Sequence, residues 1–294
     1  MPRTRPTLDP FGRRGLRRGR IGRRRVALRP IPVRAILPNL VTLLALCLGL
    51  TAIRMTFEGR YEAAIAAVVL AAVLDAVDGR MARALRSTSR FGAELDSLTD
   101  FVNFGVAPAI MVYGWILDEI RSIGWLAALT FAICAALRLA RFNVMLLGER
   151  PAWQSAFFMG VPAPAAAITV LLPLYLSELG IHFAPWAAWI VLVYAVAIGL
   201  LMVSRLPTFS AKTIGTRVRR DLVLPILVLS VVLVGLLVSY PFAVLAAGTL
   251  AYLAALPAGL TAWRRLADRN PAGAAAAGPG EGGPGPARPH ANDR

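Results

Sequence analysis

Long apolar segments separated by short polar stretches dominate this chain. A helix needs about 20 residues to cross the hydrocarbon core of a bilayer, and eight of these segments have close to that length. The last two meet at Ser239, Tyr240 and Pro241, which predicts a tight hairpin, although a re-entrant pair would have the same pattern. The pattern predicts an all-α polytopic membrane protein, with helices over residues 37–55, 61–80, 94–117, 123–147, 160–178, 184–204, 221–239 and 241–263.

The composition agrees with this interpretation, because 57% of the residues are hydrophobic and the mean hydropathy is +0.63. In a soluble chain, a net charge of +16 would indicate nucleic-acid binding. Here the basic residues gather at the termini and in alternate loops, as in membrane proteins whose cytoplasmic loops carry excess Lys and Arg. We therefore expect both termini in the cytoplasm and no nucleic-acid partner. Cys47 and Cys134 lie in apolar segments and are expected to be reduced packing residues.

The two ends of the chain differ from its apolar middle. Residues 1–36 are rich in Arg and lack interleaved aromatic residues, which favours attraction to anionic lipid headgroups over binding to nucleic acid. Residues 265–294 are rich in Pro, Gly and Ala and are expected to be disordered. The transmembrane domain is therefore predicted to cover residues 37–264.

Four Asp residues interrupt the apolar pattern around the second and third segments. Asp75 and Asp78 are three residues apart, and Asp96 and Asp100 are four apart, so each pair shares one helix face. A carboxylate within a membrane is costly unless it is paired or binds a cation. Oxygen ligands from two facing helices suit Mg²⁺ or Mn²⁺, and four carboxylates suit two ions. The alternative is pairing with nearby basic residues, namely Arg80, Arg83, Arg86 and Arg90.

This stretch contains Asp75-x2-Asp78-Gly79-x2-Ala82-Arg83-x8-Gly92-x3-Asp96-x3-Asp100, which resembles the signature of the CDP-alcohol phosphotransferases. That family moves a phosphatidyl-type group from a CDP-linked lipid onto an alcohol and releases CMP. The resemblance implies the fold of that family and a two-metal centre held by the four Asp residues, with Asp100 also the general base. It further implies that Gly79, Arg83 and Ser89 contact the CDP group.

The opening of the first segment, Pro38-Asn39-Leu40-Val41-Thr42, also resembles this family. In the family, similar Pro-Asn-x-x-Thr openings lie near the nucleotide, which implies that Asn39 and Thr42 contact CDP. A helix-entry signal would give the same pattern, because Pro is favoured at the start of a helix.

Several stretches outside the Asp signature resemble bacterial integral-membrane phosphatidylserine synthases within this family. The resemblance implies CDP-diacylglycerol and L-serine as substrates, a site on the cytoplasmic side of a bacterial inner membrane, and a homodimer. Eight spans agree with it, since many other family members have six. Asn103 stands where Ser is usual and is a candidate serine or phosphate contact. The stretches are Phe101–Pro108, Leu137–Asn143, Phe158–Ala166 and Met202–Ser204.

Two arginines near the end of the fourth segment point independently to an anionic acceptor. Arg138 and Arg141 are three residues apart on one helix face, and the guanidinium fork suits a carboxylate or a phosphate oxygen. They would also serve as ordinary basic anchors at the membrane surface. Glycerol 3-phosphate or inositol phosphate stays open as the acceptor, and a secondary transporter is a remote alternative. A phosphorylated acceptor would need a larger cationic pocket, which Lys212, Arg217, Arg219 and Arg220 could supply.

Overall fold

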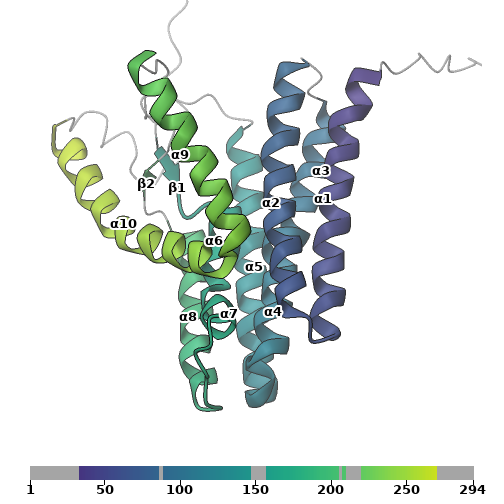
Figure 1. The fold of residues 1–294 in the computed structure, drawn as a ribbon, viewed down its shortest axis with the longest axis vertical. Coiled ribbons are helices and arrows are strands. Elements are labelled where there is room, and N and C mark those ends of the chain that lie inside the picture. The colour runs from purple at the N-terminus through teal and green to yellow at the C-terminus, as the bar shows by residue number, and fades with distance from the viewer. Residues whose placement is uncertain (1–32, 86–88, 147–156, 205–206, 210–219, 270–294) are drawn as a thin grey trace, which may run out of the picture. The chain divides into compact units, whose positions relative to one another are not determined.

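The first two apolar segments form a pair of long helices in the computed structural model, which describes residues 33–85, 89–146, 157–204, 207–209 and 220–269. Helices α1 (Val33–Phe57) and α2 (Tyr61–Ala84) pack side by side (Figure 1). Gly59 makes the turn with φ of +71°, a conformation that favours glycine. The amide of Gly59 donates to the Thr56 carbonyl at 3.0 Å, and that of Arg60 donates to the Met55 carbonyl at 2.9 Å. This Schellman motif ends α1 and returns the chain along it.

The third segment is one helical run with a wider turn in its middle. Helix α3 (Arg90–Asp100) continues into a π-helical stretch, η1 (Phe101–Val106), and then into α4 (Ala107–Trp115). Pro108 lies in the first turn of α4 and has no amide hydrogen to donate to the carbonyl of Phe104, which favours a local change of helix type. The π-helical turn starts directly after Asp100, and such turns are frequent at functional sites.

The fourth and sixth predicted segments pack against each other. A 3₁₀ turn, η2 (Leu117–Ile120), leads into α5 (Arg121–Leu146), which packs along α8 (Ala187–Val203).

The all-α prediction needs one addition among the described residues. Two three-residue strands, β1 (Phe157–Met159) and β2 (Pro207–Phe209), pair antiparallel with Phe157 opposite Phe209. Segments this short carry too little alternation to be recognised as strands from sequence.

The last two segments form helices α9 (Arg220–Ser239) and α10 (Pro241–Arg269), joined at Tyr240 as the hairpin prediction required. From Leu224 to Val238, α9 exposes nearly all of its apolar side chains. In contrast, α10 contacts the two short helices of the fifth segment, α6 (Ala163–Val170) and α7 (Leu172–Glu178).

The length and composition of the described helices agree with a membrane protein. Three of them are long and apolar enough to cross a bilayer, over Ile36–Phe57, Arg90–Trp115 and Leu117–Val144. Shorter apolar helices cover Ala187–Val203, Leu224–Ser239 and Pro241–Pro257. The count of eight spans and the cytoplasmic position of both termini stay predictions. Of the predicted arm (residues 1–36), residues 33–36 form the start of α1, and of the predicted tail (residues 265–294), residues 265–269 form the end of α10. The other residues of the arm and the tail lie outside the described part of the chain.

Tyrosine hydroxyls satisfy the backbone where the fifth segment breaks between α6 and α7. Pro173 has no amide hydrogen to donate to the Thr169 carbonyl four residues earlier. The Tyr194 hydroxyl of α8 donates to that carbonyl at 2.6 Å, and the Tyr175 hydroxyl donates to the Ile168 carbonyl at 3.0 Å. Because no water in a bilayer core can take their place, these bonds hold α6 and α7 in their broken arrangement against α8.

Replacing Tyr194 by Phe is expected to lower the free energy of unfolding by about 1–3 kcal/mol, because the Thr169 carbonyl loses its donor. A Pro173→Ala chain regains an amide hydrogen at position 173, so the same Tyr194→Phe change should cost less than half as much there. Unfolding of the four proteins in detergent measures both effects. An equal cost in the two backgrounds would show that Tyr194 does not replace the missing proline donor.

Candidate metal centre and active site

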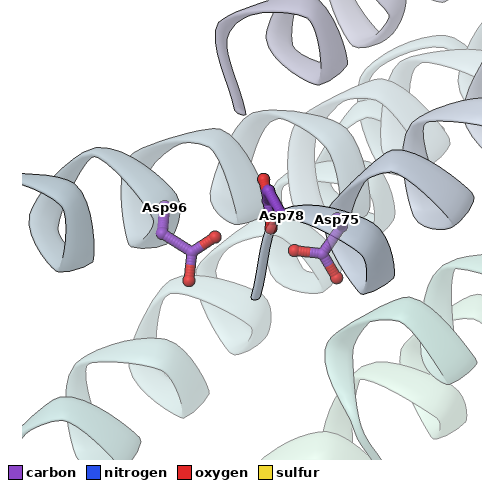
Figure 2. Close-up of side chains that lie close together, drawn as sticks. All are labelled: Asp75, Asp78 and Asp96. Atoms are coloured by element: carbon purple, nitrogen blue, oxygen red, sulfur yellow. The ribbon is translucent and has the colours of Figure 1, made fainter. Parts of the chain in front are cut away.

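Four carboxylates from two helices line one cavity of about 280 Å³. Asp75 and Asp78 lie in the second half of α2, and Asp96 and Asp100 lie on α3. Carboxylate oxygens of Asp75, Asp78 and Asp96 lie within 4.8 Å of one another. Figure 2 shows Asp78 between the other two, with the carboxylates of Asp75 and Asp96 turned toward the space between them. The i,i+3 and i,i+4 spacings therefore bring carboxylates of both helices close together.

Asp100 lies on the wall of the same cavity, next to this cluster of three. Its carboxyl group is within hydrogen-bonding reach of Asp75. Its Oδ1 atom is buried and has no hydrogen-bond partner among the described residues. A buried carboxylate oxygen without a partner is costly, so this atom is available to a ligand or an ion. The predicted grouping of four carboxylates agrees with this geometry, and their roles stay predictions.

Within the part of the chain that the structure describes, no basic side chain forms an ion pair with the cluster. The salt bridges among the described residues join Arg54 to Glu58 and Arg60 to Glu58, and both lie at the α1–α2 turn. Arg83 and Arg138 line the cavity, but neither forms an ion pair with the carboxylates. Ion pairs with the described arginines therefore do not account for the four Asp residues. An all-oxygen set of buried carboxylates fits a hard divalent cation.

A second cavity, of about 180 Å³, adjoins the first. The two share Asp78, Gly79, Arg83 and Asp96 in their walls. All five residues predicted to contact the CDP group line the second cavity, namely Asn39, Thr42, Gly79, Arg83 and Ser89. The structure therefore brings together residues from α1, α2 and the start of α3 next to the acidic cluster.

Two glycines in the walls keep this second cavity open. A Cβ atom on Gly92 would lie 2.9 Å from Asn39 Oδ1 and 3.1 Å from Ser89 Oγ. Glycine at this position therefore lets these two polar groups lie close to the backbone of α3. Ser89 caps α3 by accepting a hydrogen bond from the Gly92 amide at 2.9 Å. A Cβ atom on Gly79 would meet nothing nearer than Arg83 Nη1 at 3.8 Å, which leaves the space beside it to the cavity.

Thr42 has a partner that the sequence did not reveal. Its hydroxyl donates to Asp78 Oδ2 at 2.8 Å, and the Pro38 carbonyl lies 3.1 Å from the same hydroxyl oxygen. Asp78 is only 3% exposed, so this bond from α1 orients a buried carboxylate of α2. Carboxylates that ligate metals are commonly oriented by such hydrogen bonds. Contact of Thr42 with CDP stays a prediction beside this observed bond.

The three residues predicted to contact the acceptor substrate lie in three different places. Arg138 of α5 lines the cavity with the four carboxylates. Arg141 donates to the Val203 carbonyl at the end of α8 at 3.3 Å. Asn103 is fully buried in η1 and donates to the Ala45 carbonyl of α1 at 3.0 Å, and it is not among the described residues that line either cavity. A Cβ atom on Gly49 would overlap its amide, so Asn103 packs tightly against α1.

Sequence reasoning did not single out several residues beside the acidic cluster. Leu139 and Phe142 of α5 and Pro164 of α6 complete the larger cavity. Asn143 donates to Ser97 Oγ at 2.9 Å and ties α5 to α3 beside Asp96. The signal for them was present, because Leu137–Asn143 and Phe158–Ala166 are two of the stretches that resemble phosphatidylserine synthases.

Comparison with known proteins gives the family of this chain. The CDP-alcohol phosphatidyltransferase family matches residues 35–201, and a second description, CDP-alcohol phosphatidyltransferase 2, matches residues 221–257. The first match covers more than half of the chain. It extends from the first turn of α1 to the last turn of α8. The chain belongs to the CDP-alcohol phosphatidyltransferase family.

Curated relatives include bacterial and archaeal enzymes. The CDP-diacylglycerol–serine O-phosphatidyltransferase of Mycobacterium leprae is 44% identical over 184 residues, 61% of this chain and 60% of the relative. The protein of the same name from Helicobacter pylori strain 26695 is 37% identical over 183 residues, 61% of this chain and 75% of the relative. The archaetidylserine synthase of Methanothermobacter thermautotrophicus is 36% identical over 173 residues, 57% of this chain and 67% of the relative. The aligned region thus spans about 60% of the Mycobacterium leprae relative's length.

Replacing Thr42 by Val is expected to weaken binding of Mn²⁺ or Mg²⁺ by about 10–100-fold, because Asp78 loses the hydrogen bond that orients it. Titration of the purified protein with Mn²⁺, followed by electron paramagnetic resonance, measures the affinity. Thr56→Val is the matched control, since Thr56 is also buried on α1 but its hydroxyl donates to the Ala52 carbonyl of its own helix. Equal Mn²⁺ affinity of the Thr42→Val and Thr56→Val proteins would contradict the orienting role.

Proposed function

We propose that this protein transfers the phosphatidyl group of CDP-diacylglycerol to the hydroxyl group of L-serine and releases CMP. The observation that carries the proposal is the cluster of carboxylate oxygens from Asp75, Asp78 and Asp96 within 4.8 Å, with Asp100 on the same cavity wall. The adjoining cavity, lined by the five candidate CDP contacts, supports a nucleotide beside that cluster. Family membership supports this class of reaction.

The four Asp residues would hold Mg²⁺ or Mn²⁺ ions, with two ions as the expected number, and the ions would supply positive charge against the diphosphate. Gly79 leaves room for the nucleotide, and Arg83 lines both cavities, where it can donate to phosphate oxygens between them. Asn39 and Ser89 present polar atoms to the nucleotide cavity. These residues would orient the lipid-side phosphorus toward Asp100.

Asp100 is the proposed general base. It accepts the proton of the serine hydroxyl while the serine oxygen forms a bond to the lipid-side phosphorus and the bond from that phosphorus to CMP breaks. The position of Asp100 beside the three clustered carboxylates, on the wall that also carries Arg138, supports this assignment. No covalent enzyme intermediate is required.

Arg138 is the proposed site for the serine carboxylate, because its guanidinium lines the cavity with Asp100. The names of the three relatives support serine as the acceptor, since each includes serine or a serine lipid. We also propose a homodimer in a bacterial inner membrane, with eight spans and with both termini and the site on the cytoplasmic side. The charge asymmetry of the loops supports this topology.

The acceptor assay tests the reaction. Purified protein is given CDP-diacylglycerol, Mn²⁺ and one of L-serine, glycerol 3-phosphate or inositol phosphate, and CMP and the lipid product are measured. We expect metal-dependent CMP release with phosphatidylserine as product, lost on chelation of the metal and restored by its return. Phosphatidylglycerol phosphate or phosphatidylinositol phosphate as product would retain the family and overturn serine as the acceptor. Absence of metal-dependent CMP release with every acceptor would overturn the transferase assignment.

Replacing Asp100 by Asn is expected to lower the rate of transfer by about 10²–10⁴-fold, because the amide cannot accept the serine proton. Binding of CDP-diacylglycerol should persist, since the nucleotide cavity is lined by other residues. Mn²⁺ affinity is measured in the same protein, which separates loss of a base from loss of a metal ligand. Asp118→Asn, at an exposed carboxylate that accepts a hydrogen bond from Tyr113, is the control. Near-normal turnover of Asp100→Asn would remove Asp100 from the base role.

A further inference from the structure

Over the part of α10 whose side chains are described, Tyr252 lies on the face that packs against other helices. This face is a stripe of residues three or four positions apart, as expected for a helix buried on one side. Ala246 and Thr249 are buried in it, and the larger side chains of the stripe pack against the core. The stripe consists of Phe242, Leu245, Ala246, Thr249, Tyr252, Leu253 and Leu256.

Tyr252 and Arg138 each carry a buried polar atom without a hydrogen-bond partner among the described residues. These atoms are the Tyr252 hydroxyl oxygen and Arg138 Nε. The two side chains lie within electrostatic range of each other, although they belong to α10 and α5. Arginine can only donate hydrogen bonds, whereas a tyrosine hydroxyl can both donate and accept. The two atoms are therefore complementary partners.

Arg138 and Tyr252 have different positions relative to the larger cavity. Arg138 is among the residues that line it with the four carboxylates, and Tyr252 is not among the described residues that do. Tyr252 thus lies within electrostatic range of Arg138 without lining the cavity. A hydrogen bond from Nε to the phenol oxygen would leave the two terminal nitrogens of the guanidinium facing the cavity, where their fork can bind a carboxylate.

We propose that Tyr252 is a positioning residue for the acceptor, which holds Arg138 in the orientation that binds the acceptor's carboxylate. This inference rests on the proposed function. It gives α10, a helix outside the first family match, a part in selecting the acceptor. Residues 221–257, which include Tyr252, are matched by the second family description rather than the first. The α9–α10 pair thus takes part in choosing the acceptor, while α1 to α3 bind the nucleotide and the metal.

A Tyr252→Phe protein tests the positioning role, because it removes only the hydroxyl. We expect the KM for serine to rise about tenfold or more, the size expected for a hydrogen bond to a charged group. The KM for CDP-diacylglycerol and the melting temperature should stay unchanged, since the ring remains packed. The matched control is Thr249→Val, which removes another buried hydroxyl without a partner among the described residues, one turn away on the same face of α10. It should leave the KM for serine unchanged.

A double-mutant cycle with Arg138→Lys shows whether the hydroxyl acts through the guanidinium. Lysine has no Nε–H fork, so Tyr252→Phe should have little further effect on the KM for serine in that background. An unchanged serine KM in Tyr252→Phe, or an equal rise in both backgrounds, would overturn the proposal. A rise equal to that of Thr249→Val would also overturn it, because a general packing defect would then explain the change.

The wild-type protein separates this proposal from the proposed function. If it releases CMP with another anionic acceptor and not with serine, the proposed function is wrong. The same cycle run with that acceptor then decides whether Tyr252 holds Arg138 in the orientation that binds the acceptor's anionic group, with the same expected and contradicting results.

Discussion

Four carboxylates within apolar helices must be neutralised, and the rest of this structure is arranged around that requirement. Among the described residues no basic side chain forms an ion pair with them, although Arg83 and Arg138 line the same cavity. A buried negative cluster without a paired cation is unfavourable unless a metal ion binds there or some of the carboxylates take up protons. The chemistry that we propose therefore uses the same arrangement of negative charge that favours binding of a divalent cation.

Local features of the chain place these carboxylates. The Schellman turn at Gly59 returns α2 along α1, which brings Thr42 to Asp78. The Ser89 cap starts α3 at the residue spacing that turns Asp96 and Asp100 toward α2. The π-helical turn begins after Asp100 and leads into a tightly packed contact between Asn103 and α1. Each feature is modest alone, and together they hold the two acidic helices in one relative position.

Much of the helical architecture was predictable, because membrane-length apolar segments and helix spacing are local properties of the chain. The α1–α2 pair, the α9–α10 hairpin and the grouping of two Asp pairs follow from such patterns. The break between α6 and α7 did not, although Pro173 is visible in the sequence. A proline weakens a helix, but whether the chain breaks there depends on partners such as the Tyr194 hydroxyl from another helix.

Which residues share a helix face follows from their spacing along the chain, so Asp75 and Asp78 form one pair and Asp96 and Asp100 form another. The sequence also indicated the family, because the spacing of the Asp signature is contained within one stretch of chain. Helix packing, by contrast, places Arg138 in the wall of the acidic cavity and Arg141 against α8, although their spacing predicted one shared face. Helix packing also brings the Thr42 hydroxyl to Asp78 and places Tyr252 within electrostatic range of Arg138. The reason is that periodicity orients side chains around a single helix, whereas their partners depend on how several helices pack.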